Sequence, residues 1–227
     1  MSVGAAPAAA CTGVSRTYRT ATRPVPALVD VTVTVPRGRV TVVVGPSGSG
    51  KSSLLRLLAC IDRPDTGAVH VAGQRVDQLR ARARRRLRRQ QVAHLFQRPG
   101  DNLLPYLDAV GQVRLAAQLR GAPVPAAAAL QLLDRLGLRD RAGHRPAQLS
   151  GGEQQRLAVA CGVVGSPALV VADEPTAELD TAAADRVLAA MVELADDGVG
   201  FVVSSHDPRV LAVADGVVRL DHGRVVP

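Results

Sequence analysis

The sequence predicts an α/β fold in which a helical block interrupts a core of strands and helices. Roughly the first hundred residues are rich in strand-like runs, residues from about 99 to 165 carry helical patterns, and the remainder alternates strand-like with helical runs. Alternation of the last kind is typical of a sheet that helices cover. The chain has no internal repeat and no linker-like stretch, so we expect a single domain.

The composition agrees with a packed domain. Of the 227 residues, 47% are apolar and 21% are charged, which excludes bulk disorder. The two Phe and two Tyr are the only aromatic residues, so the core is expected to be aliphatic. No apolar run approaches the roughly 20 residues that a membrane-spanning helix needs. We therefore expect that the chain does not itself cross a bilayer.

The basic charge is unevenly distributed. A net charge of +8 permits binding to nucleic acid, anionic lipid or nucleotide without choosing among them. Lys51 is the only lysine, an arginine bias that we attribute to GC-rich coding. The segment Arg80–Arg89 contains seven arginines. A solvated helical face is its ordinary interpretation, and contact with anionic lipid headgroups is the alternative. Nucleic-acid binding is disfavoured because no aromatic residue is interleaved.

The cysteines and the start of the chain point to the cytoplasm. Cys11, Cys60 and Cys161 form no CxxC pair, so we expect small buried hydrophobic residues in a reducing compartment. Residues 1–11 end in small residues before a cysteine, as a lipoprotein signal does, but they lack a basic and a leucine-rich region, and Pro7 interrupts them. We expect them to form an untethered tail.

Individual elements follow from periodicity. In the first part, residues 28–35 alternate apolar with polar residues, residues 39–44 form a continuous β-branched run, and residues 68–73 and 92–96 are further short strands. A strongly basic helix is predicted at 78–91.

After three predicted helices in the block from 99 to 165, strands return. We predict strands at 168–173 and 200–205 with a helix at 181–197 between them. The end of the chain predicts a hairpin with His222 and Gly223 at its turn.

The strongest motif follows the strand at 39–44. Its nine residues are Gly45, Pro46, Ser47, Gly48, Ser49, Gly50, Lys51, Ser52 and Ser53. A strand before it and a helical run after it are the context of a phosphate-binding loop, whose backbone N–H groups surround the phosphates. Lys51 would contact the phosphates as a compact cation, and the Ser52 hydroxyl would ligate Mg²⁺. A simple Gly/Ser turn is the alternative, but a chance match has odds of about one in a thousand. We conclude that a nucleoside triphosphate binds here.

A second motif, ALVVADEPT, ends a hydrophobic strand with two acids. Asp173 would lie at the carboxyl edge of the sheet, where α/β folds bind ligands, and could hold Mg²⁺ through a water molecule. Glu174 could orient or deprotonate an attacking water. Taken alone, such a strand is more often followed by an ordinary solvated loop, but the phosphate-binding loop favours the catalytic interpretation.

A third motif, LSGGEQQR, opens a helix at Ser150. Ser150 and Glu153 have the spacing of a capping box, and a capped helix end is also an anion site. Together with the two other motifs, this octet resembles the signature of ABC-type ATPases, and the resemblance covers nearly the whole chain.

The resemblance implies a fold in which a P-loop NTPase core, with a RecA-like mixed sheet and flanking helices, carries an antiparallel β subdomain and an α-helical signature subdomain. We predict one domain over 1–227. Residues 1–97 and 166–227 would form the α/β core with the β subdomain, and residues 98–165 the helical subdomain.

The resemblance also implies a shared active site. The signature residues Ser150, Gly151, Gly152 and Glu153 would act on the nucleotide of a second copy, so that two copies sandwich two ATP molecules. Asp180 resembles the aspartate of the loop that links the two sites.

Three further residues match positions of the family's site. Gln97 would contact Mg²⁺ and the attacking water, and couple the site to a membrane partner. His206 would contact the γ-phosphate, although a lone histidine at a strand end is usually a surface residue. Tyr18 would stack on adenine, although a lone tyrosine is usually a packing residue.

Longer sequence runs indicate which branch of the ABC-type ATPases the chain resembles. GAVHVAGQRVDQL, FQRPGDNLLP and HRPAQLSGGEQQRLAVA resemble ATPases that serve lipoprotein-release and macrolide-export permeases, a branch that includes a cell-division ATPase. Cys161 stands where an Arg is usual, Ser53 replaces a usual Thr, and AELD replaces a more neutral loop. None of these departures removes a catalytic group.

The expected function is therefore ATP binding and hydrolysis, with Mg²⁺, in a homodimer that drives a separate integral-membrane permease from the cytoplasmic face of the membrane. Transport and force transmission to a cell-wall enzyme both remain open. The alternative is a soluble ABC ATPase that acts on nucleic acid or the ribosome. Such proteins carry tandem domains, zinc modules or long coiled coils, and the interval between Gln97 and Ser150 leaves room for an ordinary helical subdomain alone. No nucleic-acid partner is expected.

Overall fold

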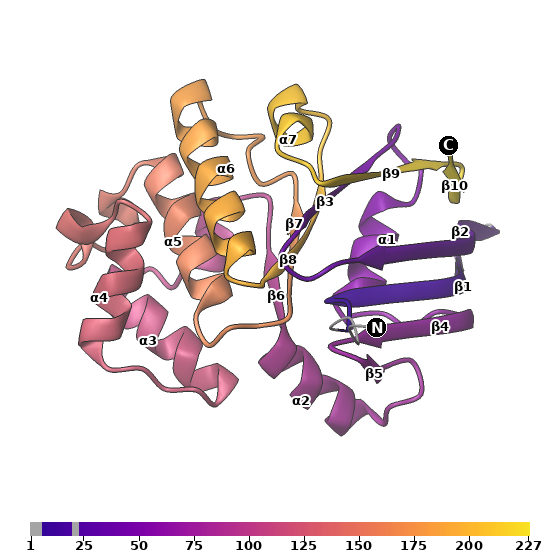
Figure 1. Ribbon diagram of the computed structural model, residues 1–227, viewed down its shortest axis with the longest axis horizontal. Helices are drawn as coiled ribbons and strands as arrows, with labels where there is room; N and C mark the ends of the chain where they lie inside the picture. Colours follow the sequence, from indigo (N-terminus) through magenta and orange to yellow (C-terminus); the bar gives the residue numbers. More distant parts are fainter. Residues whose placement is uncertain (1–5, 20–22) are drawn as a thin grey trace, which may run out of the picture.

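The computed structural model describes residues 6–19 and 23–227 (Figure 1). The described strands are β1 (Ala9–Arg19), β2 (Pro24–Val35), β3 (Val40–Val44), β4 (Thr66–Val71), β5 (Gln74–Arg75), β6 (Val92–Leu95), β7 (Leu169–Asp173), β8 (Gly200–Ser204), β9 (Gly216–Asp221) and β10 (Arg224–Val226). The α-helices are α1 (Lys51–Leu58), α2 (Ala81–Gln91), α3 (Ala109–Arg120), α4 (Ala126–Arg135), α5 (Gly151–Val163), α6 (Thr181–Asp196) and α7 (Pro208–Ala212).

The strands form a large and a small sheet. The large sheet has the order β10-β9-β3-β8-β7-β6, in which only β10 is antiparallel to its neighbour. The small sheet is antiparallel with the order β2-β1-β4-β5. Parallel β3, β7 and β8 end at the same edge of the large sheet, so the segments that follow them come together there. The predicted α/β fold with an antiparallel sheet and a helical block is confirmed.

The large sheet is buried on both faces, which explains its continuous apolar runs. In β3, Val42 belongs to the core shared with α3, α4, α5 and α6, whereas Val43 belongs to the core shared with α1 and the small sheet. In β8, Phe201 and Val202 divide in the same way. Figure 1 shows α5 and α6 on one side of this sheet, and α1 with β1, β2 and β4 on the other. Burial of each such aliphatic side chain contributes about 1.5–3 kcal/mol.

The helical block has no core of its own. Leu157 of α5 and Leu133 of α4 share one buried cluster with Val42 of the large sheet. The predicted division of the chain at residues 98 and 165 is therefore not marked by a break in packing, and it stays a prediction.

The N-terminal tail prediction is wrong for residues 8–11, while residues 1–5 of that tail lie outside the described residues. Ala8, Ala9 and Cys11 are buried, and β1 lies between β2 and β4. A side chain on Gly200 would come within 2.4 Å of the Ala8 Cβ atom, so the chain passes very close to β8 at this point. The small residues that suggested a tail are the ones that this tight packing requires.

The other predicted elements lie within a few residues of their observed positions, and β1, β5 and α7 had not been predicted. Cys60 is buried like Cys11, and Cys161 is partly buried. Burial raises the pKa of the Cys11 and Cys60 thiols to about 11, as expected of inert core residues. None of the helices in the described part of the chain combines the length and the apolar composition that crossing a bilayer requires.

Candidate active site

The loop from Gly45 to Gly50 connects β3 to α1, and its first carbonyl groups contact the side chain of Lys51, the first residue of α1. Lys51 Nζ donates to the carbonyl oxygens of Gly45, at 2.7 Å, and of Pro46, at 3.0 Å. Gly50 precedes the helix with φ of 105°, and a Cβ atom there would lie 2.4 Å from the Ala27 carbonyl oxygen. Only glycine fits this position. The sequence thus folds into a tight turn that presents the ammonium group and the start of α1 together.

Ser49 lies inside this loop and has an unused polar group. The residue is 2% exposed, and no described residue hydrogen-bonds its Oγ atom. Buried hydroxyls almost always have a partner. An oxyanion bound in the loop would supply one.

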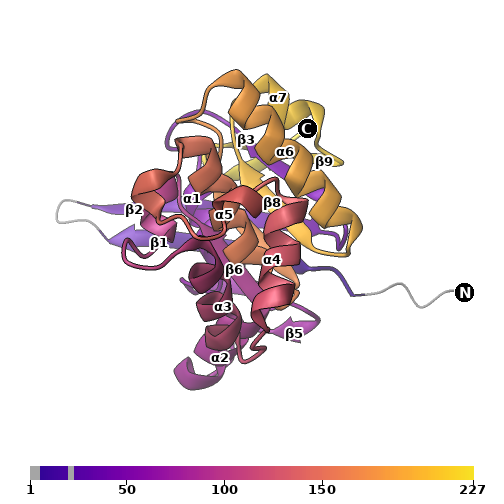
Figure 2. The ribbon, with the colours of Figure 1, turned by 90° about the vertical axis from the view of Figure 1, so that its left-hand side faces the viewer.

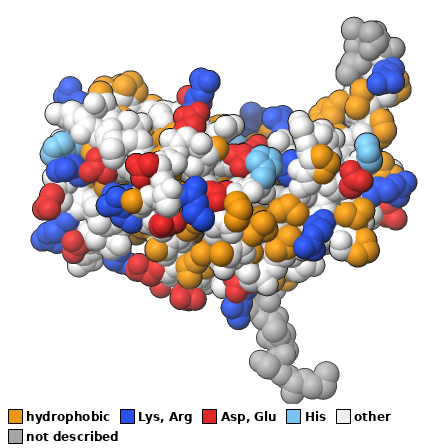
Figure 3. Space-filling view, turned by 90° about the horizontal axis from the view of Figure 1, so that it is seen from above, with side chains coloured by type: hydrophobic (Ala, Val, Ile, Leu, Met, Phe, Trp, Pro, Cys, Tyr) orange, Lys and Arg blue, Asp and Glu red, His pale blue; other side chains and the backbone are white. Residues whose placement is uncertain are grey.

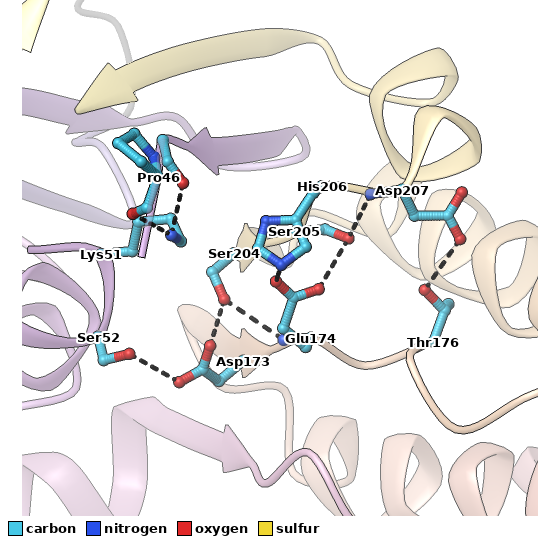
Figure 4. Close-up of polar contacts among 11 residues, drawn as sticks. Pro46, Lys51, Ser52, Asp173, Glu174, Thr176, Ser204, Ser205, His206 and Asp207 are labelled. Carbon is cyan, nitrogen blue, oxygen red and sulfur yellow. Dashed lines mark hydrogen bonds and ion pairs between the residues drawn. The ribbon is translucent and has the colours of Figure 1, made fainter. Parts of the chain in front are cut away.

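Asp173 ends β7 beside this loop (Figure 4). The Ser52 hydroxyl, from the first turn of α1, donates to Asp173 Oδ2 at 3.1 Å. The Ser204 hydroxyl, from the end of β8, donates to Asp173 Oδ1. The loop motif and the acid motif, far apart in sequence, therefore meet through a serine–aspartate contact. Two hard oxygen donors in contact suit Mg²⁺, which needs few protein ligands when phosphates supply the rest.

Glu174 follows in a left-handed backbone conformation with φ of 47°. Its backbone N–H donates to the Ser204 carbonyl oxygen at 3.0 Å, which fixes the turn. The Ser205 hydroxyl donates to Glu174 Oε2 at 3.1 Å, and His206 Nε2 lies 2.6 Å from Glu174 Oε1. The Glu174 side chain is 17% exposed and that of His206 70%, so the histidine is the part of the pair that solvent or a ligand reaches.

Sequence reasoning missed Ser204 and Ser205. Both are fully buried, and each hydroxyl contacts one of the two acids. The available signal was a pair of hydroxyl residues at the end of a buried strand, where a purely structural strand would carry apolar side chains. The parallel pairing of β7 with β8 places them there, since Asp173 is in register with Ser204.

Gln97 follows β6 at the same edge of the sheet, next to β7. Its side chain is exposed and hydrogen-bonds none of the described residues. Asn102, which the sequence did not single out, holds the segment around it. Its side chain accepts from Phe96 N at 2.9 Å and donates to the carbonyl oxygens of Phe96 and Arg98. Gln97 is thus placed near Asp173 but not joined to it.

Tyr18 has its own partners on the side of the small sheet. Its hydroxyl donates to Asp62 Oδ2 at 2.8 Å, and the Arg16 guanidinium lies 4.9 Å from its ring centre. Arg56 donates to the same carboxylate and is the main reason that the pKa of Asp62 is lowered. The structure therefore shows Tyr18 in contact with Asp62 and Arg16, and its contact with adenine stays a prediction.

The signature segment lies elsewhere. Ser150 caps α5 by accepting from Glu153 N at 3.2 Å, while Glu153 accepts from Ser150 N at 2.8 Å, so the predicted capping box is present. The backbone N–H of Ser150 is the main cause of the lowered pKa of Glu153, and Arg141 adds to it. Ser150, Gly151 and Asp180 line one cavity of about 480 Å³.

This cavity joins two of the predicted site segments but not the phosphate-binding loop. Asp180 caps α6 by accepting from Ala183 N at 2.8 Å, and Gly152 of α5 packs against Ala183. A Cβ atom on Gly152 would lie 2.6 Å from that of Ala183, so the two helices approach closely because this residue is a glycine. Within one copy, the signature residues and Asp180 thus form one group, and the phosphate-binding loop with Asp173 and Glu174 forms another.

Comparisons with known proteins identify the family of the chain. The family model described as ABC transporter matches residues 28–177. The macrolide export ATP-binding/permease proteins MacB of Paracoccus denitrificans and Rhodopseudomonas palustris are 42% and 41% identical over 216 residues, 94% of this chain but 32% and 33% of their own lengths. The chain thus spans about a third of the curated relatives it matches. The ATP-binding cassette MJ0796, solved as a dimer in a post-hydrolysis state with ADP and Pi, has a TM-score of 0.85 at 30% identity, over 96% of this chain and 97% of that one.

Proposed function

Because the chain belongs to the ABC transporter family, we propose that it binds and hydrolyses ATP, with Mg²⁺, to drive a membrane permease. The observation that carries the proposal is the meeting of Lys51, Ser52, Asp173 and Glu174 at one sheet edge, where the Ser52 hydroxyl is 3.1 Å from Asp173. A loop cation, two oxygen donors and a second acid are the parts that phosphoryl transfer to water requires.

In this proposal the chain's own groups bind the triphosphate. The loop N–H groups and Lys51 hold the β- and γ-phosphates, and the Ser49 hydroxyl gains a partner there. Ser52, Asp173 and Gln97 would hold Mg²⁺, which would supply positive charge beside the phosphates. The Ser52–Asp173 contact supports the first two of these ligands, because their oxygens already lie 3.1 Å apart.

Glu174 then orients or deprotonates the attacking water. Its carboxylate is largely shielded and held on one oxygen by Ser205. His206, on the other oxygen, is exposed and would contact the γ-phosphate. Loss of the γ-phosphate would therefore remove a contact of His206, the residue that touches the Glu174 carboxylate.

The second half of the site would come from another copy. Ser150, Gly151, Gly152, Glu153 and Asp180 surround their own cavity in each chain, which supports a head-to-tail dimer in which that cavity faces the partner's nucleotide. MJ0796 is known as a dimer. We further propose an integral-membrane permease as partner and the cytoplasmic face of the membrane as location, because relatives named ATP-binding/permease proteins are about three times longer than the matched region. Nucleic acid is not a proposed partner.

Replacement of the loop lysine tests the proposal. Lys51→Ala is expected to weaken ATP binding at least about 100-fold, because the charged group and its two loop contacts are lost. Lys51→Arg should not restore binding, since a guanidinium does not fit the tight loop. Calorimetric titration and ATPase assays with and without Mg²⁺ measure both effects, and Arg37→Ala, an exposed cation elsewhere, is the control. Near-native affinity in Lys51→Ala would overturn the assignment.

A further inference from the structure

Helix α2 carries an arginine stripe, which we define as Arg82, Arg85, Arg86 and Arg89. Their spacing of three, four and seven residues places them on one helix face. All four are exposed, and they alone line a surface hollow of about 440 Å³. No acidic side chain among the described residues forms an ion pair with any of them. On the opposite face, Leu87 is buried and anchors the helix.

The charge pattern of α2 works against the helix itself. Arg80 occupies the N-cap without a side-chain hydrogen bond, and the first turn contains no acid. Cations at a helix N-terminus and like charges four residues apart are both unfavourable. Arg84, on the same helix, has its pKa lowered by burial and by Arg63 nearby. A local arrangement that costs stability indicates a function for the charge.

The position of the stripe separates it from the candidate active site. Figures 1 and 2 both show α2 at the end of the molecule opposite α7, the short helix that follows His206 of the candidate active site. The face shown in Figure 3 mixes acidic and basic side chains, whereas α2 carries one sign only. A ligand on the stripe would therefore not compete with nucleotide.

We propose that the arginine stripe binds the anionic phospholipid headgroups of the membrane. A guanidinium group can donate two parallel hydrogen bonds to the oxygens of one phosphate. Four guanidinium groups in one hollow can therefore bind several headgroups at a lipid surface. A nucleic-acid strand is the weaker match, because α2 contributes no aromatic side chain for base stacking. The anionic nature of the ligand follows from the stripe alone, and the choice of a membrane rests on the proposed function.

Vesicle binding tests the proposal. Full-length protein is mixed with phosphatidylcholine vesicles that contain either no phosphatidylglycerol or a large fraction of it, and bound protein is measured by sedimentation at low and high salt. The wild type is expected to bind only the anionic vesicles and to be released by salt. At about five-fold in affinity per arginine, the combined change of the four stripe residues to Gln should weaken binding at least about 100-fold.

A matched control carries the same loss of charge outside α2. It replaces four exposed arginines, namely Arg37, Arg114, Arg145 and Arg224, with Gln. This control should retain most of the vesicle binding. Equal binding of stripe variant and control, binding of the wild type to neutral vesicles, or tighter binding to a DNA duplex than to anionic vesicles would each overturn the proposal. ATPase activity without vesicles is measured in parallel and should be equal in both variants. Its absence in the wild type would count against the proposed function and leave the vesicle result intact.

Discussion

At the scale of single residues, the candidate site depends on two buried hydroxyl groups. Ser204 and Ser205 are neighbours at the end of β8, and they contact Asp173 and Glu174 respectively. A carboxylate held by a buried donor keeps one orientation, and removal of the donor leaves a buried acceptor unsatisfied. We therefore regard both serines as positioning residues for the two acids.

Ser205→Ala is expected to lower kcat for ATP about tenfold and to leave the KM for ATP nearly unchanged. The reason is that Glu174 loses one oriented contact, worth about 1.4 kcal/mol, while the phosphate-binding loop is untouched. Ser205→Thr, which keeps the hydroxyl, should restore kcat. Steady-state kinetics of the three proteins decide the matter. An unchanged kcat in Ser205→Ala, or a change in KM alone, would contradict the positioning role.

At the scale of elements, the contact between α5 and α6 places the signature. Gly152 allows the two helices to approach closely, and Ser150 and Asp180 cap them at the same end. The cavity at that end is therefore a product of helix packing and not of loop conformation.

Gly152→Ala is expected to lower the free energy of unfolding by about 1–2 kcal/mol, because its Cβ atom would lie 2.6 Å from that of Ala183. Gly151→Ala is the matched control. Its Cβ atom would lie 3.6 Å from Leu179, an ordinary contact, so the better helix propensity of Ala should raise stability by up to about 1 kcal/mol. Urea unfolding measures both. Equal effects in the two variants would show that helix packing does not distinguish the glycines.

The secondary-structure elements also explain which parts of the site could be predicted from the sequence. Some motifs lie at a single strand end or helix start, such as the loop before Lys51 and the cap at Ser150. They were predictable because their geometry is local. The hydroxyl of Ser204 on Asp173 was not, since it depends on which strands become neighbours in the sheet. For the same reason β1 was missed: Ala8, just before it, is buried against Gly200 of β8, which is far away in the sequence.

At the scale of the whole molecule, the pH dependence of stability depends on a small set of carboxylates. Five carboxyl groups of the described residues have lowered pKa values, namely Asp62, Asp77, Glu153, Asp207 and Asp215. A lowered pKa in the folded state means that the contribution to stability is complete above the ordinary carboxyl range. This contribution is lost as the pH falls through the lowered values.

The free energy of unfolding should therefore decrease slightly below about pH 6.5, because burial lowers the pKa of His94, and decrease further below about pH 4, where the five carboxylates become protonated. Asp215 joins the start of β3 to the segment before β9 by accepting from Val40 N, the main cause of its lowered pKa, and from Arg39. Asp215→Asn should lower stability at pH 7 and flatten the acid dependence. Urea unfolding between pH 3 and pH 8 measures both proteins. A stability that rises on acidification would contradict this assignment.

The most direct test of the account concerns assembly, because each chain holds its two groups of site residues apart. Glu174→Gln keeps the shape of the side chain but removes the carboxylate that would activate water, so the variant should bind ATP without hydrolysing it. We expect ATP to convert this variant from monomer to dimer in size-exclusion chromatography with light scattering. A further Ser150→Arg substitution should return it to monomer by placing bulk and charge against the opposing phosphates. A Glu174→Gln protein that binds ATP and stays monomeric at micromolar concentrations, both alone and with its permease, would contradict the shared site.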